Sequence, residues 1–218
     1  MTMKNVLLAT GIVFSLLCFH GVSCAVVLYP MADSPTLSSE PGTNFNGYSS
    51  YLDAELWSGV FTGGTESRSF LKFNLAGLPA VNSAVLWLYN GVDYGPGSGW
   101  QAADVGAYSA SSAWTEGTLA WGNQPAPDAF GSTTNVGSAA GWYSWDVTSL
   151  IQPQAGLSAS IALVSSGDAH IFYARETETG YMPYLDVDCT VPEPATLVLF
   201  GALLPLVYFC RSCYNLHR

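Results

Sequence analysis

The chain has 218 residues, of which 16 are Asp or Glu and six are Lys or Arg, so its formal net charge is −10. All 16 acidic residues but only three of the basic ones lie within residues 26–194, which leaves that stretch with a charge of −13. Such an acidic surface repels polyanions, so nucleic acid is excluded as a partner. The length favours one main domain between two terminal segments.

The first 25 residues have the pattern of a secretory signal peptide. Lys4 gives a positive start, an apolar run follows over residues 6–19, and small residues at Ser23 and Ala25 suit cleavage after Ala25. A lipoprotein signal in which Cys24 is the lipidated residue is the alternative interpretation. Both interpretations predict export, and the first gives residues 1–25 an N-terminal signal helix that is not part of the mature fold.

Residues 26–190 have the pattern of an all-β domain. Gly and Pro separate short runs that are rich in Val, Leu, Tyr, Trp and Phe, and no stretch shows a sustained helical period. We therefore expect a β-sandwich of jelly-roll type with a sizeable core. One helical turn is expected at 146–152, and loops are expected at 91–100 and 122–132. The clearest strands are predicted at 67–75, 83–90, 158–166, 170–176 and 183–189.

Two of these predicted strands alternate in a way that indicates one face toward the core and one face away from it. The opposed sets are Leu71, Phe73 and Leu75 against Arg68, Phe70 and Lys72, and Leu86 and Leu88 against Val85, Trp87 and Tyr89.

Cysteine usage predicts no disulfide within the domain. Cys18 and Cys24 fall in the predicted signal, and Cys210 and Cys213 fall in the C-terminal tail. Cys189 then stands alone in the globular part, where its only route to a disulfide would be a second copy of the chain.

Residues 191–218 form a distinct tail with three features in fixed order. Pro192, Glu193 and Pro194 come first, an apolar segment follows over 195–210, and Arg211 comes directly after it. A short membrane-spanning helix is expected at 195–210. The tail resembles the PEP-CTERM sorting signal of bacterial exported proteins. That resemblance implies processing by an exosortase-type peptidase, membrane contact before processing, and delivery to the cell envelope, cell surface or extracellular matrix.

Several segments of the domain together resemble the DNRLRE-domain family. The resemblance spans residues 26–190 and implies an exported β-sandwich, in some members a carbohydrate-binding module that takes acidic polysaccharide such as alginate. The matching segments, in chain order, are SSYLDAELW, SRSFLKFNLAGLP, SAVLWLYN, WTEGTLAWGNQPAP, GWYSWDVTSLIQ and FYARETETGYMPYLDVD.

Three basic residues and three aromatic ones are the candidate ligand-binding residues. Arg and Lys suit the carboxylate of a uronate, although they equally suit structural ion pairs with acids such as Glu116 or Glu176. Exposed aromatic rings stack against sugar rings through the apolar C–H edges of the sugar. The candidates are Arg68, Lys72 and Arg175 for charge, and Trp57, Trp100 and Tyr94 for stacking, whereas Trp114, Trp121 and Trp145 are expected in the core.

Calcium in a structural role is the one candidate cofactor, and a domain without a cofactor is the alternative. Carboxylate oxygens are the ligands that calcium prefers, although no EF-hand spacing is present. The candidate ligands, near predicted strand ends, are Asp33, Asp53, Asp186 and Asp188.

Catalytic motifs are absent from the sequence. His170 is the one histidine between the two terminal segments, and neither a zinc-binding spacing nor a nucleophile motif accompanies it. We therefore expect a non-catalytic protein that binds carbohydrate or exopolysaccharide. The alternatives are a structural matrix or adhesion protein without sugar specificity, and a polysaccharide lyase or hydrolase built on paired carboxylates or His170.

Overall fold

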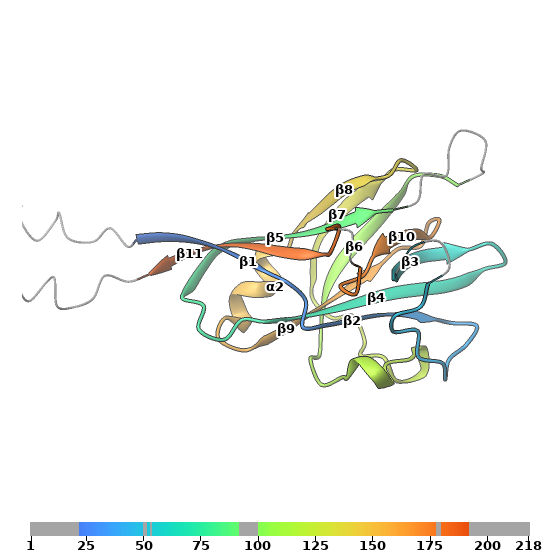
Figure 1. The fold of residues 1–218 in the computed structure, drawn as a ribbon, viewed down its shortest axis with the longest axis horizontal. Coiled ribbons are helices and arrows are strands. Elements are labelled where there is room, and N and C mark those ends of the chain that lie inside the picture. Colours follow the sequence, from blue (N-terminus) through green and yellow to red (C-terminus); the bar gives the residue numbers. More distant parts are fainter. Residues whose placement is uncertain (1–21, 50–51, 53, 92–99, 178–179, 192–218) are drawn as a thin grey trace, which may run out of the picture. The chain divides into compact units, whose positions relative to one another are not determined.

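A computed structural model describes residues 22–49, 52, 54–91, 100–177 and 180–191 (Figure 1). Residues Cys24–Cys189 form one compact unit, and segments 1–23 and 190–218 are grouped apart from it. Residues 1–21 of the predicted signal helix, the sorting motif and the predicted membrane segment 195–210 lie outside the described residues, whereas residues 22–25 form part of a strand. Within the described part of the chain, no helix has the length and hydropathy needed to cross a membrane.

The described part of the chain is built mainly from strands, as the composition predicts. The clearest predicted strands are confirmed as β4, β5, β9, β10 and β11, with small changes in their bounds. The strands are β1 (Val22–Leu28), β2 (Ala32–Leu37), β3 (Glu55–Phe61), β4 (Thr65–Asn74), β5 (Ala80–Asn90), β6 (Ala103–Ala110), β7 (Phe130–Val136), β8 (Gly141–Asp146), β9 (Ser158–Val164), β10 (His170–Tyr173) and β11 (Tyr184–Val191).

Among the residues that the structure describes, helical structure is confined to short turns. The expected helical turn is confirmed as α2 (Thr148–Ile151), where the Asp146 carboxylate accepts a hydrogen bond of 3.0 Å from the Thr148 N–H. This bond satisfies one of the N–H groups that a helix start leaves without an intrahelical partner. The 3₁₀ turns are η1 (Glu116–Thr118), η2 (Trp121–Asn123) and η3 (Gln152–Gln154).

The strands form two layers that share β3. In the first layer, sheet A, the order is β1-β11-β5-β10-β3, and β8 pairs with β5. In the second layer, sheet B, the order is β3-β4-β9-β6-β7, and β2 pairs with β4. The β-sandwich expected from the sequence is therefore confirmed, while its jelly-roll type stays a prediction.

β3 passes from one sheet to the other at a glycine. Ser58 pairs with His170 of β10 in sheet A, and the next residue, Gly59, pairs with Ser67 of β4 in sheet B. Gly59 has φ +132°, and a Cβ there would lie 2.5 Å from the carbonyl oxygen of Asp168. Both the backbone angle and the close approach require glycine.

The core lies between the inner faces of the two sheets. The alternation in β4 and β5 is confirmed, because Leu71, Phe73, Leu86 and Leu88 are completely buried in it. Trp145 is also completely buried, and its indole N–H donates a 2.7 Å hydrogen bond to the carbonyl oxygen of Val105. Side chains on the outer faces of the two sheets are therefore either covered by a loop or open to solvent.

The cysteine prediction is wrong. Cys24 and Cys189 form a disulfide bond that joins β1 to the neighbouring β11. Residue 24 belongs to the sandwich, and so Cys189 has its partner within the same chain. The loop expected at 122–132 is also shorter than expected, because β7 begins at Phe130.

Candidate functional site

The outer face of sheet B carries the first two predicted binding residues, Arg68 and Lys72 on β4. Their strand lies between β2 and β9, and Phe70 between them is completely buried. The face is covered by residues 111–128, which bring Trp114 against Phe70 at a ring distance of 6.3 Å. We call residues 111–128 the covering segment.

Both basic residues hold the covering segment. The Lys72 ammonium donates a hydrogen bond to the carbonyl oxygen of Trp114 and lies 4.4 Å from the centre of the Trp114 ring. Burial lowers the pKa of Lys72 from its ordinary value. The Arg68 guanidinium lies 4.7 Å from the ring of Trp121 and 3.7 Å from the carboxylate of Glu66. These are cation–π contacts that fix the segment to the sheet.

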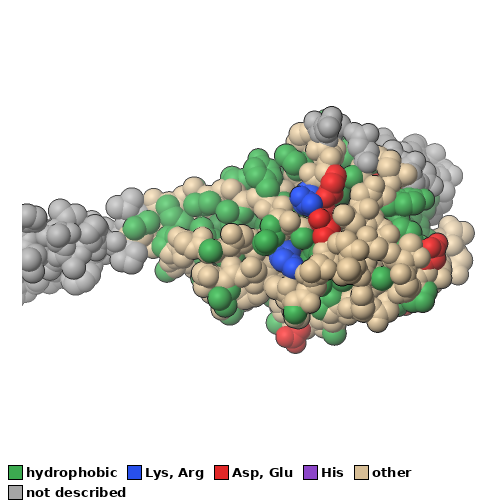
Figure 2. Space-filling model, turned by 60° about the horizontal axis from the view of Figure 1, so that its bottom comes forward, with side chains coloured by type: hydrophobic (Ala, Val, Ile, Leu, Met, Phe, Trp, Pro, Cys, Tyr) green, Lys and Arg blue, Asp and Glu red, His purple; other side chains and the backbone are tan. Residues whose placement is uncertain are grey.

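Arg175 is held by an acidic pair. Its Nε and Nη2 donate hydrogen bonds of 2.8 and 2.6 Å to the two carboxylate oxygens of Glu116, in the fork geometry typical of arginine. Its Nε also lies 3.0 Å from Glu176. The structural alternative considered for Arg175 is the one that the geometry supports. Figure 2 shows Lys and Arg side chains next to Asp and Glu side chains on one face of the molecule.

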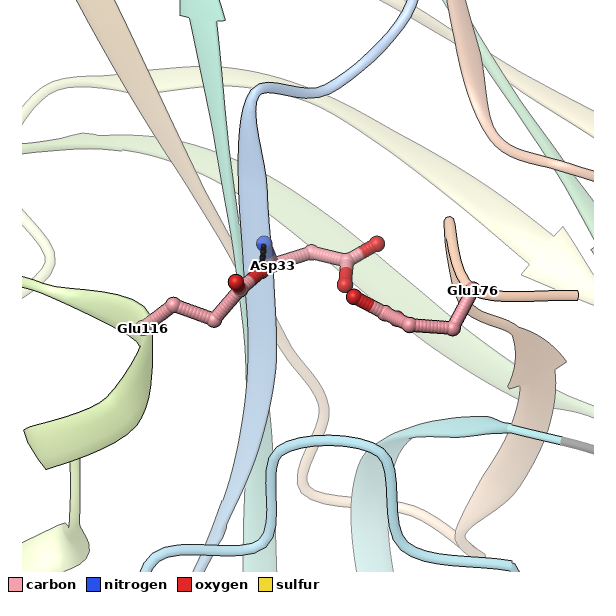
Figure 3. A group of neighbouring side chains, drawn as sticks. All are labelled: Asp33, Glu116 and Glu176. Carbon is pink, nitrogen blue, oxygen red and sulfur yellow. Dashed lines mark hydrogen bonds between the residues drawn. The ribbon is translucent and has the colours of Figure 1, made fainter.

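Asp33, Glu116 and Glu176 converge, as Figure 3 shows. One oxygen from each lies within 4.8 Å of the others. Arg175 lies against the two glutamates. The Asp33 carboxylate accepts a 2.9 Å hydrogen bond from the backbone N–H of Arg175. The backbone N–H of Asp33 donates a 2.8 Å hydrogen bond to the carboxylate of Glu116. Burial, and then the charge of Glu176, raise the pKa of Asp33 well above its ordinary value. These contacts join β2, the covering segment and the residues after β10.

The predicted calcium ligands do not come together among the described residues. Asp33 groups with Glu116 and Glu176, Asp186 and Asp188 lie exposed on β11, and Asp53 lies outside the described residues. Calcium takes six to eight oxygen ligands. Around Asp33, however, the Arg175 guanidinium already binds both Glu116 oxygens and one from Glu176. This cluster therefore does not fit a calcium site, and a structural calcium elsewhere stays a prediction.

The predicted stacking residues differ in exposure. The expectation that Trp57 is exposed is wrong: it is 5% exposed, because the rings of Phe45 and Tyr48 pack against it at 5.3 and 5.2 Å. Its indole N–H donates a 2.7 Å hydrogen bond to Glu55. Trp100 is half-buried and lines a surface pocket of about 390 Å³. Tyr94 lies outside the described residues.

Six aromatic side chains gather on the outer face of sheet A, and we call this surface the aromatic face. Trp142 and Tyr181 are the most exposed of them, at 38% and 37%. A continuous chain of ring contacts runs through the set, with centroid distances of 4.2 to 6.1 Å. In the order of these contacts, the residues are Trp87, Tyr184, Trp142, Tyr89, Tyr181 and Tyr173.

Strand alternation and register create this surface. Successive side chains of a strand point to opposite sides, so Trp87 and Tyr89 point outward while Leu86 and Leu88 enter the core. Tyr89 pairs directly with Trp142 of β8. Gly91 leaves room for Tyr173, because a Cβ at position 91 would lie 2.7 Å from that ring.

The charges beside the aromatic face are acidic. Asp146 lies on the same side of β8 as Trp142, and Asp186 and Asp188 lie on the same side of β11 as Tyr184. Burial and the charge of Asp186 raise the pKa of Tyr184. The three Lys and Arg residues between positions 26 and 191 are those bound to the covering segment and its acids.

Comparison with known families decides what kind of domain this is. The model of carbohydrate-binding module family 96 matches residues 25–188. The chain belongs to this family. Within this module, the aromatic face presents rings of the kind that sugar stacking uses.

Other comparisons add little to this assignment. No curated protein matches the chain. Among solved structures, the module is similar to the enzymatically active domain of tailspike protein 4 from bacteriophage CBA120, with 9% identity, a TM-score of 0.32, and coverage of 78% of this chain and 19% of that one. It is also similar to the K1 cleaved adhesin domain of Lys-gingipain from Porphyromonas gingivalis W83, with 12% identity, a TM-score of 0.32, and coverage of 77% and 96%.

The sequence carried a partial signal for the aromatic face of this module. The alternation at 83–90 already sets Trp87 and Tyr89 apart from the core residues. The contributions of Trp142, Tyr173, Tyr181 and Tyr184 were missed, since they depend on which strands lie beside β5, and strand order is a long-range property.

Proposed function

We propose that this protein is an exported, non-catalytic polysaccharide-binding protein that holds its ligand on the aromatic face. The aromatic face is the observation that carries the proposal. A stacking contact contributes about 0.5–1.5 kcal/mol beyond the area that it buries. Several rings in one continuous row therefore suit successive units of a polymer better than a single sugar.

The charge of this surface favours a neutral polysaccharide over an acidic one. Asp146, Asp186 and Asp188 flank the rings, and like charges would repel the carboxylates of alginate or pectin. The basic residues that would attract a uronate, Arg68, Lys72 and Arg175, are instead engaged with the covering segment and with Glu116. The ligand proposed here therefore differs from the acidic polymer that the DNRLRE resemblance implies for some members.

Export is supported by the disulfide as well as by the sequence. Disulfides form and persist in oxidising compartments such as the periplasm and the extracellular space. The signal pattern and the PEP-CTERM-like tail, with Pro192, Glu193, Pro194 and Arg211, agree with that location. We accordingly place the protein at the cell envelope or in the extracellular matrix of a bacterium, with an exosortase-type peptidase as its processing partner.

The buried position of His170 counts against the enzymatic alternative that uses this histidine. His170 is completely buried, so a polymer has no access to it. Burial lowers its pKa, against a smaller opposing effect of Asp168. The structural matrix alternative shares the fold and the location with our proposal, and it differs by predicting no affinity for any sugar.

Affinity electrophoresis separates these functions. The purified protein is run through gels containing a neutral glucan, a neutral mannan, alginate, pectin or no polymer, each with calcium and with a chelator. We expect retardation in a neutral polymer, loss of that retardation in Trp142→Ala, and no loss in Phe130→Ala, which removes an aromatic ring of 55% exposure from β7 on sheet B. Migration unchanged in every gel would overturn the proposal and leave the structural matrix function.

A further inference from the structure

Cys24 is part of the folded domain. Its disulfide with Cys189 joins β1 to β11, with the two Cα atoms 5.0 Å apart. Cys189 is completely buried, and the compact unit begins at Cys24 and ends at Cys189. The bond thus closes the domain at its first and last residues.

The side chains of β1 agree with that placement. Cys24, Val26 and Leu28 are partly buried, and Ala25 and Val27 between them are exposed. Leu28 packs against the main core. This is the alternation of a strand with one face on the domain, and residue 24 lies on the inner side of it.

Neither processing interpretation of the leader is compatible with this bond. Cleavage after Ala25 would remove Cys24 together with the signal. Lipidation would convert the Cys24 sulfur to a thioether, which has no thiol left for a disulfide. In an exported protein that keeps the Cys24–Cys189 bond, any cut of the leader must fall on the N-terminal side of Cys24, and the Cys24 sulfur must not carry a lipid.

We infer that the export peptidase hydrolyses the Ser23–Cys24 peptide bond, so that Cys24 becomes the first residue of the mature protein. Gly21 and Ser23 are small residues at the third and first positions before that bond, which is the pattern signal peptidases accept. The inference rests on the exported location in the proposed function, but not on sugar binding.

The chemistry after cleavage is an oxidation. Hydrolysis consumes one water molecule and leaves Ser23 with a free carboxylate and Cys24 with a free amine. The thiols of Cys24 and Cys189 then lose two protons and two electrons as the sulfur–sulfur bond forms. The oxidant is the disulfide form of a thiol–disulfide oxidoreductase of the export compartment, which is reduced to its dithiol by exchange through a mixed disulfide.

The test is to express the full chain in a bacterium that exports it and to determine the N-terminus and the non-reduced peptide map of the mature protein. We expect Cys24 as the N-terminal residue, and one linked peptide pair containing Cys24 and Cys189 that separates on reduction. An N-terminus at Val26, a diacylglyceryl mass on Cys24, or a chain that still begins at Met1 would each overturn the inference.

Two variants keep the test independent of folding yield. In Cys189→Ser, the N-terminal residue should still be Cys24, and its thiol should now react with a maleimide. In Cys24→Ser, cleavage should continue before residue 24, and the buried thiol of Cys189 should react with a maleimide only after denaturation. Loss of membrane partition in Cys24→Ser but not in Cys189→Ser would indicate a lipid on Cys24 and contradict the inference.

Discussion

The outer faces of the two sheets use their side chains in opposite ways. On sheet B, the Arg and Lys residues are bound to a segment that covers the sheet, and little of the aromatic surface beneath is left to solvent. On sheet A, six aromatic rings contact one another, and no segment among the described residues covers Trp142 and Tyr181 in this way. The comparison teaches that the basic residues of an acidic chain can be structural, while its proposed binding surface is built from aromatic rings with acidic residues beside them.

The largest expected effect comes from removing the contacts that hold the covering segment on sheet B. Glu116→Ala removes both acceptors of the Arg175 fork and the acceptor of the Asp33 N–H. We expect the free energy of unfolding to fall by about 2–3 kcal/mol. This loss is smaller than that for a fully buried pair, because the Arg175 side chain is 34% exposed. Urea denaturation measures this loss. Glu116→Gln, which keeps one acceptor oxygen, is the control and should lose less. Equal stability of Glu116→Ala and the wild type would contradict a stabilising role for the contacts of Glu116 with Arg175 and Asp33.

The next effect tests sheet A. Trp142→Ala should weaken binding to a neutral polysaccharide about tenfold, or ~1.4 kcal/mol, since the most exposed indole of the aromatic face is lost. Titration calorimetry measures the affinity, and the urea midpoint should stay near that of the wild type because the side chain is on the surface. An affinity loss of the same size in Phe130→Ala would show that the two faces do not differ.

Substituting the basic residues of sheet B tests whether that sheet takes part in binding. Arg68→Ala and Lys72→Ala should each cost about 1 kcal/mol of stability through the lost cation–π contact. Neither change should alter retardation in a sugar-containing gel. If either substitution abolished retardation while the domain stayed folded, the binding surface would lie on sheet B after all.

A change of charge sharpens the comparison further. Asp186→Lys places a cation beside Tyr184 on the aromatic face, and it should raise affinity for alginate a few-fold at low salt. The gain should shrink as salt screens the charge. Asp104→Lys on β6 makes the same charge change on sheet B, where we expect no gain. Equal gains for the two variants would mean that net charge alone controls binding.

The smallest effect concerns His170, whose buried ring lies on the inner side of β10. Burial lowers its pKa, so below its ordinary value of 6.5 the folded state binds fewer protons than the unfolded chain. Its contribution to stability is therefore present above pH 6.5 and is lost as the pH falls below it. Urea denaturation between pH 7 and pH 5 should show this decline, and His170→Gln should reduce it. A decline that His170→Gln leaves unchanged would assign it to other groups.

Local pattern predicted much of this sandwich, and long-range contact decided the rest. The alternation of Leu71 with Lys72 and of Leu86 with Trp87 was enough to assign β4 and β5 and their core faces. The exposure of Trp57 was not predictable, because the residues that cover it, Phe45 and Tyr48, come from a loop. Cys24 was misassigned because the small residues Ser23, Cys24 and Ala25 fit the end of a signal peptide as well as they fit the start of a strand. The partners of Arg175 needed the fold, since Glu116 is 59 residues away.

The link between β1 and β11 also determines how the domain bears load. A protein that grips a polymer while its C-terminal tail is held elsewhere is pulled at residue 190. Without a cross-link, such tension would pull β11 out from between β1 and β5 one hydrogen bond at a time. The bond at Cys189 divides the tension between β11 and β1, and it makes 24–189 a covalently closed loop that traction cannot unravel while the bond is intact. Mechanical endurance would then depend on the redox state of the surroundings.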